Sequence, residues 1–210
     1  VGDVEPEAAL ARAQTHDADS DRQGDAALED PSVDAVVIAT PTPTHVNLLR
    51  RAAEAGKAIF CEKPVDLEVD AVDAALEVVR RTKVPLLVGF NRRFDPSFAR
   101  LKREVAEGRV GQVEMVSIIS RDPAPPSAEY LGGSGGLFKD MSIHDLDLAR
   151  WLLGGPVRSV FASARALTST DVKEAGDVDT AVIVLETGRA LATITNSRRA
   201  GYGYDQRVEV

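Results

Sequence analysis

The chain has 210 residues, of which 44% are hydrophobic, and this is ordinary for a globular protein with one large domain or two small ones. Its formal net charge is −8 and its pI is about 5.0, with basic residues scattered among acidic ones. A nucleic-acid-binding surface needs clustered positive charge, and a membrane helix needs roughly 20 apolar residues in a row. The sequence contains neither pattern, which argues against both classes.

Cys61 is the only cysteine, so no internal disulfide can form, and we expect a reducing compartment such as the cytoplasm. The first residues contain neither the basic segment nor the apolar one that a secretion signal would have. There is no initiator methionine, the start at Val1–Asp3 resembles the end of a strand, and the last residues alternate like a strand that stops without a turn. We therefore expect a fragment of a longer protein, clipped at both ends.

The first half of the sequence alternates helical and extended patterns. Its short apolar runs are typical of strands buried on both faces of a parallel sheet, and segments with helical spacing separate them. The predicted helices are Pro6–Gln14, Thr44–Ala55 and Val69–Arg81, and the predicted strands are Asp34–Ala39, Ala58–Cys61 and Leu86–Phe90. This β-α-β-α-β order predicts an α/β fold with a doubly wound parallel sheet.

The second half is richer in strands. Asp95 and Pro96 have the residue types of an N-cap and first helical position, and they open a predicted helix that ends near Gly108. Strands are predicted at Gln112–Ser120, Val157–Leu167, Thr180–Glu186 and Leu191–Asn196, interrupted by one helix at Met141–Leu153. We expect an antiparallel or mixed sheet here, and we place the boundary between two domains, 1–91 and 92–210, near Asn91.

Asp3 lies at a predicted strand end, just before a helix. In a dinucleotide-binding fold an acidic residue at that position bonds the adenosine ribose hydroxyls and repels a 2′-phosphate. A helix-capping role is the other interpretation, and both remain open. The G-x-G-x-x-G loop that should precede such an aspartate does not occur in the sequence.

Two further segments follow predicted strand ends, where doubly wound folds bind their ligands. Thr40–His45 offers hydroxyl groups and a helix start to a phosphate or ribose, although Thr and Pro are also ordinary residues before helices. Lys63 follows an apolar strand, so partial desolvation can lower its pKa, and the alternative is a surface lysine paired with Glu62. The Lys63-Pro64 bond is a candidate cis peptide.

Asp140 and His144 are four residues apart, so a helix that includes both places them on one face. A carboxylate beside an imidazole favours its charged form and can orient the ring. The other interpretation is a capped helix with a polar histidine. Lysine, histidine and carboxylate around one hydroxyl are suited to moving the proton in a dehydrogenase reaction.

Arg92 follows the last predicted strand of the first half and has the chemistry to bond a polyol or phosphate, or it belongs to a solvated hinge. Tyr202 and Tyr204 either line a polar pocket or form a plain turn. These interpretations stay open from the residues alone.

Five motifs in order give the chain a resemblance to the Gfo/Idh/MocA family of nicotinamide-dependent sugar oxidoreductases, most of all to its inositol 2-dehydrogenase branch. They extend over nearly the whole chain. The matching segments are Asp34–Pro41, Ala55–Lys57 with Cys61–Pro64, Gly89–Pro96, Gly135–Asp145 and Gly201–Asp205.

The resemblance implies a partial Rossmann domain followed by an α+β domain with a largely antiparallel open sheet. It implies that a polyol hydroxyl is oxidised to a ketone, with hydride passing to C4 of the nicotinamide. In this interpretation His144 is the general base, Asp140 orients it, and Lys63 bonds the same substrate oxygen. The resemblance also implies cofactor-side and substrate-side residues, with no metal: Asp3, Thr40, Pro41, His45, Glu62, Lys63 and Asn91 for the cofactor, and Arg92, Asp122 and Tyr204 for the substrate.

NAD is expected more than NADP, because Val4 follows Asp3 and no arginine is near. Without the glycine loop, we expect this 210-residue piece to bind NAD poorly. Homo-oligomers, dimers or tetramers formed through the open face of the second sheet, are expected for the full-length protein. Two alternatives remain: another sugar oxidoreductase of the same family, or a non-catalytic NAD-sensing or binding protein.

Overall fold

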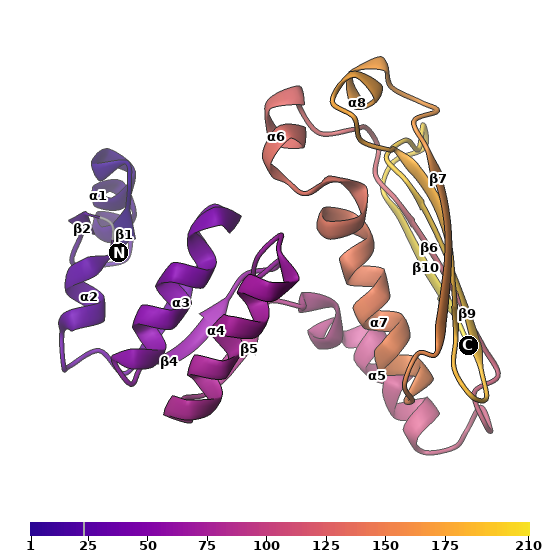
Figure 1. Cartoon of the computed structure of the whole chain (residues 1–210), viewed down its shortest axis with the longest axis horizontal. Coiled ribbons are helices and arrows are strands. Elements are labelled where there is room, and N and C mark those ends of the chain that lie inside the picture. Colours follow the sequence, from indigo (N-terminus) through magenta and orange to yellow (C-terminus); the bar gives the residue numbers. More distant parts are fainter. Residues whose placement is uncertain (23) are drawn as a thin grey trace. The chain divides into compact units, whose positions relative to one another are not determined.

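The computed structural model describes residues 1–22 and 24–210, and the chain divides into two compact units, Val1–Gly89 and Phe90–Val210. Figure 1 shows the helices and strands of each unit. Among the described residues, no helix is both long enough and apolar enough to cross a membrane.

The first unit contains two small parallel sheets where the sequence pattern predicts one. Strands β1 and β2 pair with each other, and β3, β4 and β5 form the second sheet in that order. The strands are β1 (Gly2–Asp3), β2 (Asp21–Arg22), β3 (Ala35–Ile38), β4 (Ala58–Cys61) and β5 (Leu86–Val88). The helices are α1 (Pro6–Thr15), α2 (Asp25–Glu29), the 3-10 turn η1 (Thr42–Thr44), α3 (His45–Glu54) and α4 (Val69–Thr82).

One face of the β3-β4-β5 sheet is buried by α3 and α4. Ile38, Ile59 and Cys61 are buried with Leu49 in a single hydrophobic cluster. The prediction that these strands are buried on both faces is wrong within this unit, because Val37 is 73% exposed and Leu87 is 48% exposed. The described part of the unit provides no helix to cover that second face, so an apolar run alone does not determine two-sided burial.

The second unit has a five-stranded sheet in the order β10-β6-β9-β8-β7. Its neighbouring strands are antiparallel except β6 and β9, which are parallel, so the expected mixed sheet is confirmed. The strands are β6 (Met115–Arg121), β7 (Ser159–Arg165), β8 (Thr180–Glu186), β9 (Leu191–Ser197) and β10 (Asp205–Glu209). The helical elements are η2 (Asn91–Phe94), α5 (Pro96–Ala106), α6 (Ala128–Gly133), the π-helix η3 (Phe138–Ser142), α7 (Ile143–Leu153) and α8 (Thr170–Glu174).

Helix α7 packs on one face of this sheet. The strands alternate, so that Ile118, Ile183 and Ile194 point toward α7 and are buried with Leu148 in one core. Helix α5 lies on the same side, as Figure 1 shows. Side chains on the other face are open, and Phe161 there is 65% exposed.

The predicted helix ends are largely confirmed. Asp95 is the N-cap of α5 and accepts from the N–H groups of Ser97 and Phe98 at 2.8 and 3.2 Å. Gly154 ends α7 in the left-handed conformation at φ 68°. The helix predicted from Met141 has a different start, since a π-helical turn from Phe138 leads directly into α7. A π-helical turn closes hydrogen bonds one residue further along the chain than an α-helix, a difference that α-helical spacing does not reveal.

Candidate active site

The loops after β3, β4 and β5 leave the sheet at its carboxyl edge. Backbone bonds hold the three ends in register, from Glu62 N–H to the Ile38 carbonyl at 2.9 Å and from Gly89 N–H to the Cys61 carbonyl at 2.8 Å. Thr40, Glu62 and Lys63 therefore follow strands that end side by side. Ligands of open parallel sheets bind at this edge.

His45 lies in the first turn of α3 and is buried. Its Nδ1 is 2.8 Å from the Pro64 carbonyl oxygen and its Nε2 is 2.6 Å from the Thr40 carbonyl oxygen. Carbonyl oxygens only accept hydrogen bonds, so a ring nitrogen that carries hydrogen donates to its carbonyl partner. His45 thus ties the loop after β3 to the loop after β4.

Glu62 lies against the backbone of Gly89. A Cβ at Gly89 would come 2.9 Å from a Glu62 side-chain oxygen, so this position accommodates only glycine without a shift. The same carboxylate accepts from the Lys63 N–H at 3.2 Å, and the Lys63-Pro64 bond is cis, as the sequence suggests. Burial, reinforced by the charge of Glu62, raises the pKa of the Cys61 thiol to about 12, so this cysteine is not a nucleophile at neutral pH.

Thr40 bonds Thr44 side chain to side chain at 2.5 Å, and Thr44 donates to the Pro41 carbonyl at 2.8 Å. Asp3 is half-buried, and it accepts from the Glu5 N–H at 2.9 Å just before α1. The N-cap of α1 is Glu5 and α1 has no side-chain cap bond, so Asp3 closes the turn before the helix and does not cap it. A hydrogen bond to one carboxylate oxygen does not rule out a ligand on the other oxygen.

Asp145 is the centre of a buried polar network beneath the first turn of α7. Its carboxylate accepts from Ser120 Oγ at 2.7 Å and from Asn196 Nδ2 at 2.6 Å, and it forms an ion pair with Arg92. Ser142 extends the network by donating to Asn196 Oδ1 at 2.6 Å. These contacts hold the α7 start, and with it His144, against β6 and β9.

Arg92 is mostly buried in this network. The amide of Gln206, with its oxygen turned toward the guanidinium, accepts from Arg92 at 2.6–2.7 Å. Arg92, which the family resemblance assigns to the substrate, is therefore held from two elements, α7 and β10. Its neighbour Arg93 pairs with Asp147 through two bonds at 2.5 and 2.7 Å.

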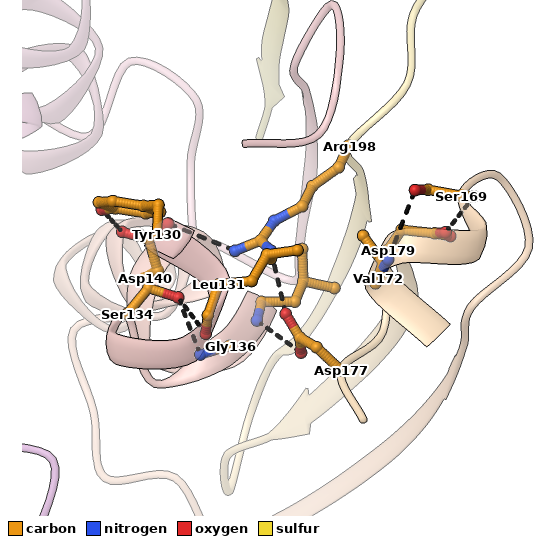
Figure 2. Close-up of polar contacts among 11 residues, drawn as sticks. Tyr130, Leu131, Ser134, Gly136, Asp140, Ser169, Val172, Asp177, Asp179 and Arg198 are labelled. Atoms are coloured by element: carbon orange, nitrogen blue, oxygen red, sulfur yellow. Dashed lines mark hydrogen bonds and ion pairs between the residues drawn. The ribbon is translucent and has the colours of Figure 1, made fainter. Parts of the chain in front are cut away.

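Asp140 lies in the π-helix η3, one turn before His144. Figure 2 shows its carboxylate between two donors, the Tyr130 hydroxyl at 2.9 Å and a guanidinium nitrogen of Arg198 at 3.3 Å. Burial and then the bond to Asp140 raise the pKa of Tyr130, which keeps this hydroxyl protonated and able to donate. The π-helical turn, a feature common at functional sites, carries Asp140 directly into the helix of His144.

Asp122 follows β6 and is partly buried. Burial raises its pKa, the charges of Asp140 and Asp145 add to the rise, and Arg198 and Arg92 oppose it. Asp122 therefore interacts electrostatically with the Asp140–Arg198 pair and with the Asp145–Arg92 pair. The structure brings Arg92, Asp122, Asp140 and His144 together at one end of the second unit.

The remaining sequence candidates have plainer surroundings. Asn91 is exposed in η2, and Tyr204 is 61% exposed just before β10. Three residues of the site were not singled out as functional by the sequence: Tyr130, Asp145 and Arg198. Asp145 is the last residue of the matching segment Gly135–Asp145, and nothing in the sequence distinguishes Arg198 from Arg199. Among the described residues, no cluster of His, Cys, Asp and Glu is arranged to hold a metal ion.

A groove of about 520 Å³ lies at the other end of the second unit, between α5, the end of α7 and the β8–β9 turn. Lys102, Arg158 and Arg189 line it together with glycine and apolar residues. None of the candidate catalytic, cofactor or substrate residues belongs to it, so the chemistry has to be sought at the carboxyl edge and the α7 start.

The carboxyl edge of the first unit fits a dinucleotide. It offers hydroxyl groups at Thr40 and Thr44 and a cation at Lys63. These are the donor types that ribose and amide groups need.

Two family models cover nearly the whole chain. One, described as the GFO/IDH/MocA C-terminal domain, matches residues 98–210. The other, described as an oxidoreductase family with an NAD-binding Rossmann fold, matches residues 1–90.

Two of the similar curated relatives are named as inositol dehydrogenases. The inositol 2-dehydrogenase of Rhizobium meliloti (strain 1021) is 51% identical over 211 residues, which is 100% of this chain and 64% of the relative. The myo-inositol 2-dehydrogenase of Thermotoga maritima is 50% identical over 184 residues, which is 87% of this chain and 55% of the relative. The chain thus spans less than two thirds of the length of these relatives.

Solved structures show the same similarity. A myo-inositol dehydrogenase from Corynebacterium glutamicum matches with a TM-score of 0.94 at 40% identity, covering 99% of this chain and 62% of that one. A scyllo-inositol dehydrogenase from Lactobacillus casei, solved with NAD(H) and scyllo-inositol bound, matches with a TM-score of 0.87 at 29% identity, covering 99% of this chain and 63% of that one.

Proposed function

Because the chain belongs to the Gfo/Idh/MocA oxidoreductase family, we propose that the protein oxidises a secondary hydroxyl of a polyol to a ketone with NAD. The names of the relatives favour an inositol, since two of them are inositol 2-dehydrogenases at 50–51% identity. The observation that carries the proposal is the position of Asp140 and His144, one turn apart at the start of a helix anchored to the sheet through Asp145.

In the proposed reaction His144 takes the hydroxyl proton as the C–H bond breaks and the carbonyl forms. Asp140 lies one turn away and stabilises the imidazolium that results. Lys63 donates a hydrogen bond to the same oxygen and stabilises the negative charge that grows there. Proton transfer of this kind typically contributes ~10²–10⁴-fold in rate. NAD, when bound, supplies the acceptor for the hydride.

The cofactor-side assignments follow the carboxyl edge of the first unit. Asp3 would bond the adenosine ribose, which favours NAD over NADP. Thr40, Pro41, Glu62, Lys63 and Asn91 would border the nicotinamide half. His45, which is buried, would act by fixing the Thr40 and Pro64 loops. Arg92, Asp122 and Tyr204 are proposed for the polyol, with Asp122 the most suited to bond hydroxyl groups.

We also propose that the full-length protein works in the cytoplasm as a homo-oligomer. The exposed apolar side chains on the open face of the second sheet support association there, because such a face buries little surface in a single copy. The single buried cysteine suits a reducing compartment.

The proposal is tested by following NADH formation by the full-length gene product over a panel of inositols, other polyols and sugar acids. We expect turnover on an inositol and a loss of kcat of about 10²-fold or more in both Lys63→Ala and His144→Ala. The matched controls are the exposed Lys139→Ala and the exposed His16→Ala, which should retain the wild-type rate.

Full activity surviving in both Lys63→Ala and His144→Ala would refute the assigned roles. Tight NAD binding without turnover on any member of the panel would instead indicate a non-catalytic NAD-sensing protein. Turnover confined to sugar acids would indicate another oxidoreductase of the same family.

A further inference from the structure

The side chain of Arg198 is the most deeply buried cation of the described chain. It follows β9 and is 1% exposed. Its guanidinium reaches Asp177 with one nitrogen at 3.0 Å and Asp140 with another at 3.3 Å, as Figure 2 shows. Burying an arginine is costly unless its charge is compensated, so this placement requires both carboxylates. We propose that Arg198 is a positioning residue that orients Asp140 for its work on His144.

Asp177 anchors the guanidinium from the opposite side. Besides Arg198, it accepts from the Leu137 N–H at 3.1 Å, directly before the π-helix η3. Gly136 has φ +75°, and a Cβ there would come 2.5 Å from Asp177 Oδ1. The glycine thus lets the carboxylate approach the backbone that leads into Asp140. Arg198 and Asp177 together fix the helix turn that carries Asp140.

Both oxygens of Asp140 have a defined donor. Tyr130 on α6 bonds Oδ1, and Arg198 bonds Oδ2. A carboxylate held at both oxygens cannot rotate freely about its side-chain bonds, so it presents one fixed geometry. Both bonds end on a carboxylate and are therefore charge-assisted, and the arginine adds a formal positive charge beside it.

The charges around Asp140 also require a cation. Asp122 after β6 and Asp177 behind the guanidinium add negative charge, and Tyr130 on α6 and His144 on α7 are further titratable neighbours. Arg92 is engaged with Asp145, whereas Arg198 pairs with Asp140. With Arg198 removed, Asp140 loses a positive charge beside it and the bond that fixes one of its oxygens.

This inference rests on the proposed function, and its main test uses the full-length gene product with NAD and the inositol that it turns over. Arg198→Met removes the charge from a side chain of similar length. Arg198→Lys retains the charge but lacks the two guanidinium nitrogens that bond the two carboxylates. Arg199→Met is the matched control at an exposed neighbouring residue. We expect Arg198→Met to lower kcat about 10-fold or more, with the KM for NAD within about 2-fold. The acid limb of its pH–rate profile should move to higher pH, and Arg198→Lys should recover part of the rate.

A merely structural arginine would give a different result. It would lower the amplitude of kcat by the same factor at every pH and leave the profile unmoved, which would overturn the proposal. An unaltered kcat in Arg198→Met would overturn it as well.

The ion pair between Arg198 and Asp140 can also be tested without measuring turnover. A negative result in this test is therefore distinct from a failure of the proposed function. Urea-unfolding midpoints are compared for Arg198→Met, Asp140→Asn and the double variant. We expect the urea-unfolding midpoint of the double variant to fall by less than the sum of the falls in the two single variants. In the double variant, removal of the arginine no longer takes the ion-pair partner from a charged carboxylate. Simple additivity would contradict the link, whatever the enzyme oxidises.

Discussion

At the scale of single residues, the buried carboxylate of Asp145 is the centre of the site, although it was not identified as functional from the sequence. Its contacts with Arg92, Ser120 and Asn196 come from three separate elements. The sequence made Lys63, Asp140 and His144 candidates through their motifs, because family motifs retain residue type and order. It did not identify Asp145, Tyr130 and Arg198, because their roles depend on which side chains the fold brings together.

Replacing Asp145 with Asn should destabilise the full-length protein strongly. The change leaves the mostly buried Arg92 without its charge partner, and it places an amide N–H₂ against the Nδ2 of Asn196. Breaking a buried pair by removing one partner costs about 3–5 kcal/mol. Asp147→Asn is the matched control on the same helix, and it should cost less, because the Arg93 side chain is 41% exposed whereas that of Arg92 is 12% exposed. Urea denaturation provides both numbers, and equal losses for the two variants would contradict the account.

At the scale of elements, the turn after β7 depends on one aspartate. Asp179 is fully buried, and it accepts from the N–H groups of Leu167, Thr168 and Ser169 at 2.8–3.1 Å. Burial alone would raise its pKa, but the hydrogen bonds from Leu167, Thr168 and Thr180 outweigh burial and lower the pKa to about 2. The carboxylate is thus the acceptor that organises the turn leading into α8.

The lowered pKa of Asp179 determines the direction in which the stability of the fold changes with pH. The folded-state pKa is below the ordinary value of 3.8, so the contribution of Asp179 is complete above pH 4 and is lost as the pH falls toward 2. Asp179→Asn should be less stable at pH 7 by about 1–3 kcal/mol, because an amide replaces the charged acceptor. Its unfolding midpoint should also fall less than that of the wild type between pH 4 and pH 2.

The exposed Asp171→Asn in α8 is the matched control for this measurement. Its unfolding midpoint should follow the wild-type pH dependence throughout. Parallel curves for Asp179→Asn and the wild type would show that Asp179 does not supply the acid-labile contribution.

The longer elements could be predicted from periodicity, and the shorter ones could not. Strand β4 and strand β8 have the predicted bounds, and α4 differs by one residue. Helices α2, α6 and α8 have only five or six residues, too few to establish a 3.6-residue period. The π-helical turn before α7 was also missed, because its period differs from the 3.6-residue period of an α-helix.

At the scale of the whole molecule, each unit has its own hydrophobic core and contributes a different part of the proposed chemistry. The carboxyl edge of the first unit presents Lys63 and the cofactor-side loops, and the second unit presents Asp140, His144 and the residues that fix them. The sequence predicted both architectures. It could not predict that β1 and β2 pair apart from β3-β4-β5, or that β6 pairs in parallel with β9, because strand partners depend on contacts far apart in the chain.

The central claim is hydride transfer from a polyol carbon to NAD by the full-length gene product. The most direct measurement uses an inositol deuterated at its ring carbons and determines the mass of the NADH formed. We predict one deuterium in each NADH, one ketone per NADH, and loss of both products in His144→Ala. Ketone formation with unlabelled NADH, or equal yields from His144→Ala and the wild type, would contradict the account.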